Sequence, residues 1–255
     1  MSEQTNSANL PGLPPQMQEN IRSFLQDILI SLPEKVLSVA LTGSCITGDY
    51  LPGKSDVNSV LVLSEITPEV LDALGSLGRR YGKKGLSAPL IMTPEYIERS
   101  LDVFPVEFLD LKLIHSTIHG RDFFSGLSIN KSLLRLQCER ELKSKLIHLH
   151  QGYISSSGKP RAANLLMMDA YPGFFPLFRA MLAIVQMNRT PPLRKEEVLS
   201  RIEASFGVYL GPLRKIRAPE GKARFGTGRQ ATRELFTEVY RITHELSLAM
   251  DQLFR

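Results

Sequence analysis

Two apolar runs, each bordered by polar residues, constrain the fold of this chain most. The run Val36–Leu41 is rich in β-branched and apolar residues and leads into Gly43 and Ser44, which predicts a strand that ends in a turn. Twelve residues after Ser44, the sequence Asp56-Val57-Asn58 opens a second apolar run, expected to be a strand over residues 58–63. A Gly-Ser turn exposes backbone N–H groups and a hydroxyl, and a carboxylate on the next strand can hold a cation. Together these groups suit a bound triphosphate.

Helical and strand patterns mix through about residue 125. Pro33 ends the first helical pattern, and Pro68 stands at an allowed first-turn position of the second. The mixture predicts an α/β sheet with helices on one face. Helices are expected over residues 16–32, 68–81 and 94–100, and strands over 36–41, 58–63, 88–92 and 103–114, the last being the longest strand candidate.

Strand patterns are lacking from residue 130 onward, and the second half predicts a bundle of about four helices. Pro172 and Pro176 must kink or divide one of them. The helices are expected over residues 133–154, 162–187, 196–206 and 229–254.

Charge is distributed unevenly along the chain. Residues 1–125 carry 10 Lys and Arg against 15 Asp and Glu, whereas residues 126–255 carry 21 against 11. This split supports two modules, of which the basic one either faces an anionic partner or simply has solvated helix surfaces. No apolar run approaches the roughly 18–20 residues that cross a bilayer, so no membrane is expected as a partner. The two cysteines have no metal-ligand spacing, which favours a reducing, cytoplasmic location.

The Gly43-Ser44 turn, Gly48 and the sequence Ser55-Asp56-Val57 together resemble the active-site signature of the DNA polymerase beta-like nucleotidyltransferases. Residues 133–142 resemble the first helix of helical domains that follow such domains in bacterial proteins. The resemblance implies an α+β chain: an N-terminal nucleotidyltransferase-like mixed sheet with helices, and a C-terminal all-α helical bundle. The expected division is a disordered tail over 1–15, the nucleotidyltransferase-like domain over 16–127 and the bundle over 128–255.

The resemblance also implies a set of acidic residues that hold Mg²⁺ or Mn²⁺. The family places a second acid two residues after the first, on the same strand face, but this chain has Asn58 there. A third acid comes from a later strand, and Glu107 is favoured over Asp110 for that position. On the expected strand the residues alternating with Glu107 are apolar, and a carboxylate on such a face is costly unless it is paired or binds a metal. They are Pro105, Leu109, Leu111 and Leu113.

The expected site therefore combines acids with nucleotide-binding groups. Asp56 and Glu107 are the predicted catalytic residues and metal ligands, and Gly43 and Ser44 are predicted to bind the triphosphate. Lys54 can supply a cation nearby, and the amide of Asn58 can coordinate a metal weakly.

Three functions are consistent with this sequence. The first is a Mg²⁺-dependent enzyme that transfers AMP, or another nucleoside monophosphate, from a nucleoside triphosphate to a small molecule, a protein or RNA. The second is a catalytically impaired nucleotide-binding or regulatory module, because Asn58 brings no charge. The third is a nucleic-acid-binding protein that uses the basic half.

Overall fold

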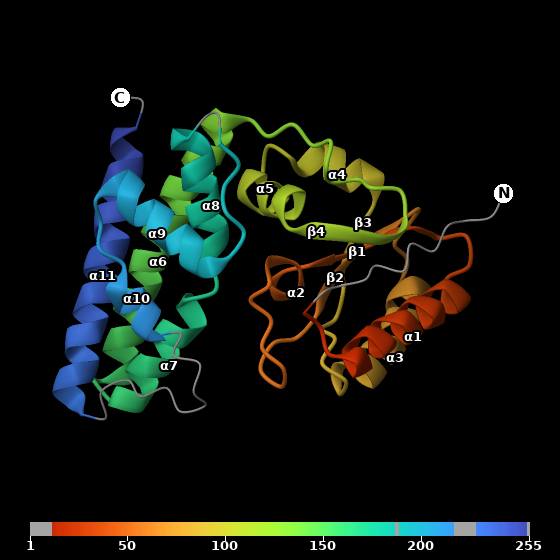
Figure 1. The fold of residues 1–255 in the computed structure, drawn as a ribbon, viewed down its shortest axis with the longest axis horizontal. Helices are drawn as coiled ribbons and strands as arrows, with labels where there is room; N and C mark the ends of the chain where they lie inside the picture. The colour runs from red at the N-terminus through yellow and green to blue at the C-terminus, as the bar shows by residue number, and fades with distance from the viewer. Residues whose placement is uncertain (1–11, 187–188, 217–227, 254–255) are drawn as a thin grey trace. The chain divides into compact units, whose positions relative to one another are not determined.

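The computed structural model describes residues 12–186, 189–216 and 228–253. The chain divides into two compact units, residues 1–129 and 130–255 (Figure 1). Of the disordered tail expected over residues 1–15, residues 1–11 lie outside the described residues. Leu13 is buried and Pro15 begins the first helix, so the end of the expected tail is part of the folded unit.

A four-stranded mixed sheet lies at the centre of the N-terminal unit, with strand order β3-β2-β1-β4. β1 is antiparallel to both β2 and β4, whereas β2 and β3 are parallel. Thr42, the last residue of β1, lies opposite Asn58 of β2 and His115 of β4. Both neighbouring strands therefore have an end beside the start of the Gly43-Ser44 turn. The strands are β1 (Val36–Thr42), β2 (Asn58–Leu63), β3 (Leu90–Met92) and β4 (His115–Gly120).

Helices cover both faces of this sheet (Figure 1). Leu41 and Leu61 point into a core shared with α1 and α3, while Ala40 and Val60 point into a second core with side chains of α4 and α5. The prediction of helices on one face was wrong, because β2 is apolar on both of its faces and buries both. These helices are α1 (Pro15–Ser31), α3 (Pro68–Gly82), α4 (Pro94–Ser100) and α5 (Pro105–Leu113).

Residues 103–114, expected to be the longest strand, form helix α5 instead. Pro105 occupies the first helical position, where its missing N–H costs nothing. Pro105, Val106, Phe108, Leu109 and Leu111 are all buried, so the helix is buried on most of its sides and no strand face alternates. The second strand that pairs with β1, besides β2, is β4, in which Ile118 is the buried side chain. Its polar sequence gives little strand signal.

The C-terminal unit is helical, as predicted. Its described residues form six helices, because Pro172 and Gly173 divide the long apolar segment and a short helix forms between two of the expected helices. α8 is buried on nearly all sides, and α6 packs against α7, α8 and α11. The helices are α6 (Lys131–Ser156), α7 (Pro160–Ala170), α8 (Phe174–Val185), α9 (Lys195–Phe206), α10 (Gly211–Ile216) and α11 (Arg229–Gln252).

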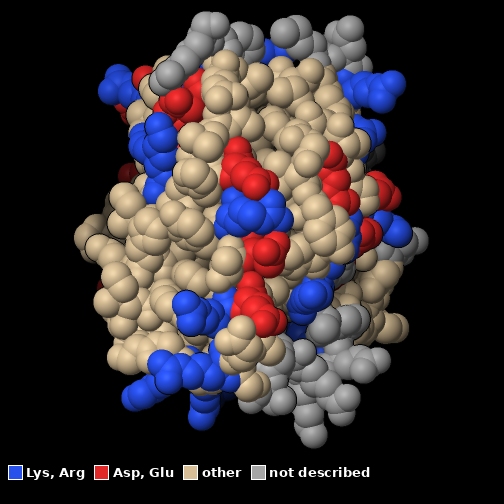
Figure 2. Space-filling view, turned by 90° about the vertical axis from the view of Figure 1, so that its left-hand side faces the viewer, with Lys and Arg blue, Asp and Glu red and all other residues tan. Residues whose placement is uncertain are grey.

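Acidic and basic side chains alternate in the middle of one face of the molecule (Figure 2). Ion pairs on α11 are of this kind: Arg241 contacts Glu238 at 2.9 Å and Glu245 at 2.7 Å. Among the residues that the structure describes, no helix is long and apolar enough to cross a membrane.

Candidate nucleotide site

The Gly43-Ser44 turn links the end of β1 to the one-turn helix α2 (Ser44–Thr47). Gly43 has φ +82° and ψ −146°, a conformation that is essentially restricted to glycine. Its carbonyl accepts hydrogen bonds from the N–H groups of Ile46 (3.0 Å) and Thr47 (3.1 Å). The first N–H groups of such a turn have no acceptor within it, so they are available to a ligand. Ser44 is half-buried and stands at this position.

Asn58 lies directly against Gly43. A Cβ built on Gly43 would be 3.0 Å from Asn58 Nδ2, and the strand register places Asn58 opposite the adjacent Thr42. The absence of a side chain at residue 43 therefore makes room for the Asn58 amide. The structure thus brings together two of the residues that the sequence predicts for nucleotide binding.

Asp56 projects from an extended segment that is fixed by its backbone. The N–H of Val57 donates to the Gly85 carbonyl at 2.8 Å, and the Val57 carbonyl accepts from the Ser87 N–H at 3.0 Å. Val57 is buried, whereas Asp56 and Asn58 are exposed. Residues two apart on an extended chain share a face, so the carboxylate and the amide lie on the same exposed side.

The charge of Asp56 acts on the segment that follows the turn. Burial raises the pKa of Tyr50, and the negative charge of Asp56 adds to the effect. Burial also raises the pKa of the Cys45 thiol to about 11, and this thiol donates a hydrogen bond to the Thr42 carbonyl. Cys45 is therefore protonated at neutral pH and serves packing, not nucleophilic chemistry.

Lys54 and Glu107 are both exposed. Lys54 lies in the turn that leads to Asp56. Glu107 lies in the first turn of α5, not on a strand of the sheet, and a carboxylate there interacts favourably with the helix N-terminus. The alternating face that favoured Glu107 over Asp110 does not exist, so the reason given for that choice was wrong. The role of Glu107 as a metal ligand stays a prediction.

The donor set at this site suits a metal ion that arrives with its nucleotide. The described residues contain no group of three His, Cys, Asp or Glu that could hold a metal ion. Mg²⁺ in nucleotide sites is commonly held by one or two carboxylates together with substrate phosphates. Asp56 and the neighbouring Asn58 amide fit that smaller requirement.

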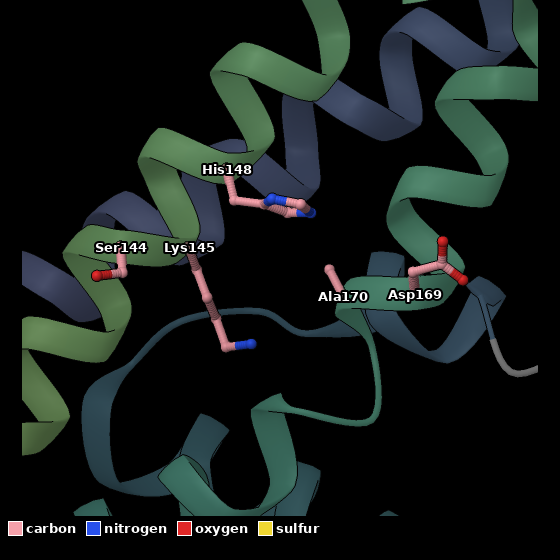
Figure 3. Close-up of a pocket in the computed structure, with 5 residues that line it drawn as sticks. All are labelled: Ser144, Lys145, His148, Asp169 and Ala170. Carbon is pink, nitrogen blue, oxygen red and sulfur yellow. The ribbon is translucent and has the colours of Figure 1, made fainter.

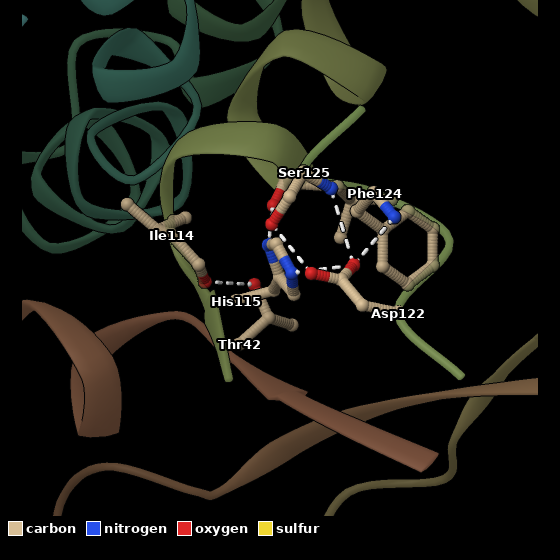
Figure 4. A network of polar contacts seen from close by, with 7 residues as sticks. Thr42, Ile114, His115, Asp122, Phe124 and Ser125 are labelled. Atoms are coloured by element: carbon tan, nitrogen blue, oxygen red, sulfur yellow. Dashed lines mark hydrogen bonds and ion pairs between the residues drawn. The ribbon is translucent and has the colours of Figure 1, made fainter. Parts of the chain in front are cut away.

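A polar network beyond the predicted residues fixes the neighbouring strand (Figure 4). His115, opposite Thr42, contacts Asp122 Oδ1 through Nε2 at 3.0 Å and the Leu111 carbonyl through Nδ1 at 2.6 Å. The Thr42 hydroxyl donates to the Ile114 carbonyl at 2.9 Å. These contacts tie the end of β1 to the junction between α5 and β4.

Asp122 organises the loop that follows β4. It accepts hydrogen bonds from the Ser125 hydroxyl and from the backbone N–H groups of Phe124 and Ser125. Desolvation raises the pKa of Asp122, but these hydrogen bonds and the nearby His115 outweigh it and lower the pKa to about 2. The Asp122 carboxylate accepts from the N–H two residues later, which is an Asx-turn. Asp is a residue type that favours such turns, so Asp122 is the sequence signal for this loop.

No protein-family model and no curated protein sequence matches this chain. A solved structure does: the crystal structure of spectinomycin adenyltransferase AAD(9) from Enterococcus faecialis with ATP and spectinomycin. The two have a TM-score of 0.56 and 15% sequence identity, over 89% of this chain and 98% of that chain. The chain has a nucleotidyltransferase fold. The likeness extends over parts of both units, so the helical half belongs to the shared architecture as well.

Proposed function

We propose that this chain is a nucleotidyltransferase, which binds a nucleoside triphosphate at the Gly43-Ser44 turn and transfers the nucleoside monophosphate to an acceptor. The observation that carries the proposal is the close approach of Asn58 to Gly43, with Asp56 exposed on the same side of the segment. The similar adenyltransferase was solved with ATP, which supports the choice of nucleotide. The acceptor is a small molecule, a protein or RNA, and the location is cytoplasmic.

Each predicted residue has a role in this proposal. The N–H groups after Gly43 and the Ser44 hydroxyl hold phosphate oxygens, while Lys54 offsets their charge. Asp56 would hold Mg²⁺ or Mn²⁺ with help from the Asn58 amide, and Glu107 is the second proposed ligand. When bound, the ion neutralises charge on the triphosphate.

A second candidate function is nucleotide binding without turnover. It is favoured by Asn58 in the position of a second acid and by the lack of any three-residue metal cluster among the described residues. In that case the protein would sense a nucleotide or regulate a partner.

Label transfer distinguishes the two functions. The protein is incubated with α-labelled ATP and Mg²⁺ or Mn²⁺, and both released pyrophosphate and labelled acceptor are measured. Asp56→Asn is expected to lower transfer by about 100-fold or more, because a charge-stabilising group is lost. Asp72→Asn, an exposed acid on α3, is the matched control and should leave transfer unchanged. Nucleotide that binds but is never consumed by the native chain would contradict the enzyme.

Asn58→Asp tests whether the missing charge limits turnover. The second carboxylate should increase transfer in the presence of Mg²⁺, since two acids on one strand face hold the ion more tightly. The same variant without divalent metal is the control, and it should show no gain. An Asn58→Asp chain that binds ATP and still lacks turnover would favour the binding module.

Glu107→Gln separates a ligand role from a structural one. A role at the first turn of α5 predicts a loss of stability of about 0.5 kcal/mol, with transfer unchanged once the chain is folded. A ligand role predicts a loss of transfer at unchanged stability. Urea unfolding and label transfer on the same preparation distinguish them.

A further inference from the structure

A cavity of about 270 Å³ lies between α6 and α7 in the C-terminal unit (Figure 3). All of its lining residues come from this one unit, and none of them is among the residues proposed for nucleotide binding. Two of them, Lys145 and His148, are three residues apart on α6 and therefore share a helix face. The lining residues are Ser144, Lys145, His148, Asp169 and Ala170.

Lys145 is half-buried against the turn between α7 and α8. Its Nζ lies 5.0 Å from the ring centroid of Phe174, within the range of a cation–π contact. A Cβ on Gly173 would be 2.7 Å from the same Nζ. The glycine thus leaves space for the ammonium group at the cavity wall.

The ammonium of Lys145 lacks an oxygen partner. Among the described residues it makes no hydrogen bond and no ion pair, whereas the preceding lysine on α6, Lys143, contacts Glu139 and Asp251. Burial lowers the pKa of Lys145, and the charge of Glu141 opposes this only in part. Glu141 itself lies 3.4 Å from Arg140. A half-buried cation without a partner is costly and is expected to gain from a bound anion.

Two nitrogen-bearing side chains extend into the cavity. In Figure 3 the side chains of Lys145 and His148 extend into the space, while the carboxylate of Asp169 points away from them. An oxyanion placed between the two would meet an ammonium and a ring nitrogen, with no acidic group pointing at it.

We propose that this cavity binds the oxyanion of a small molecule, a phosphate or a carboxylate, with Lys145 and His148 as its donors. The volume of about 270 Å³ accommodates a phosphate group with a short organic portion. The site lies outside the residues proposed for nucleotide transfer.

Equilibrium dialysis with radiolabelled inorganic phosphate tests the site on the full chain at constant ionic strength. Lys145→Met keeps the length of the side chain and removes its charge, and should weaken phosphate binding by about tenfold or more. His148→Gln should weaken it by roughly threefold. Lys143→Met is the matched control. It removes the same charge two residues earlier on α6, where the lysine is already paired with Glu139 and Asp251, and should leave phosphate binding unchanged.

The proposal is overturned if Lys145→Met binds phosphate as the native chain does, or if Lys143→Met weakens binding equally. Displacement of phosphate by acetate at comparable concentration would support a carboxylate ligand in the same site. Thermal unfolding will check that the variant is folded. The unfolding midpoint of Lys145→Met should be higher than that of the native chain, because a half-buried charge without an oxygen partner is lost.

Discussion

Gly43 is the residue on which the geometry of the nucleotide site depends. Its backbone conformation strains any side chain, and an added methyl would lie 3.0 Å from Asn58 Nδ2. We expect Gly43→Ala to lower the free energy of unfolding by about 1–3 kcal/mol and to weaken ATP binding. Urea unfolding and nucleotide titration measure the two effects.

Gly75→Ala is the matched control for that change. A Cβ on Gly75 of α3 meets no atom within 4 Å, so this substitution should stabilise the chain by about 0.5–1 kcal/mol. Equal responses of the two glycines would contradict the special role of residue 43.

Asp122 makes stability depend on acid. Because its folded pKa of about 2 lies below the usual 3.8, the carboxylate contributes its full stabilisation above pH 3.8 and loses it as pH falls toward 2. Asp122→Asn should therefore cost about 1 kcal/mol at pH 7, from weakened capping hydrogen bonds, and progressively less between pH 3.8 and 2. Urea unfolding across this range measures the difference, and a difference that is constant with pH would refute the assignment.

At the scale of elements, Arg214 joins α9 to α10. Its guanidinium donates to Glu196 at 2.6 Å and to both Glu203 oxygens at 2.7 and 2.9 Å, and these bonds raise the pKa of Arg214. Glu203 also accepts from the Leu210 N–H at 2.7 Å. Arg214→Met leaves this carboxylate partly unpaired and should lower the free energy of unfolding by about 1–3 kcal/mol.

Arg241→Met provides the comparison for Arg214→Met. Arg241 also contacts two glutamates, but all three residues lie on the exposed side of one helix, so the cost should be about 0.5 kcal/mol or less. Urea unfolding in one buffer measures the free energy of unfolding of both variants. It compares the contacts of Arg214, which link two helices, with those of Arg241, which lie on the surface of one helix. Equal costs would show that the Arg214 contacts do not hold α9 and α10 together.

The elements that the sequence predicts well are those with one strong local signal. β1 and β2 are apolar, β-branched runs, so the sequence indicates both strands. Their antiparallel register, which places Asn58 opposite Thr42 and beside Gly43, is found only in the structure. Residues 105–113 are apolar on most sides, and such a short run fits either period. Only the proline at the first position favours the helix.

That one ambiguity removed the reason for choosing Glu107 over Asp110 as the third acid, and it hid β4, the second neighbour of β1. β4 is recognisable only by its pairing with β1. Its residues are mostly polar, and the hydrogen bonds that make it a strand are formed with a segment far away in the sequence. The contact between His115 and Asp122 joins β4 to a loop seven residues later in the sequence, and no periodicity predicts it. Long-range polar contacts of this kind have no counterpart in a local pattern.

At the scale of the whole molecule, the excess of basic residues in the second half raises the question of a nucleic-acid partner. Several of these residues are already neutralised locally: Arg135, Lys143, Arg214 and Arg241 each form an ion pair with a carboxylate. On the face in Figure 2, acidic side chains lie directly above and below a basic one. A phosphate backbone following this column would meet carboxylates as often as cations.

Single-stranded RNA binding also needs exposed aromatic rings on which bases stack. In the described part of the C-terminal unit, Phe236 is buried and stacks on Tyr153 at 4.1 Å, and Tyr209 is the exposed aromatic side chain, at 68%. We therefore expect the affinity for a labelled RNA 20-mer to fall by less than about tenfold between 50 and 200 mM salt, whereas six to ten phosphate contacts would give about 10³–10⁵. Fluorescence anisotropy at the two salt concentrations measures this. A loss of 10³ or more would show that the basic half follows an RNA backbone, and would make RNA the first acceptor to test in the transfer reaction.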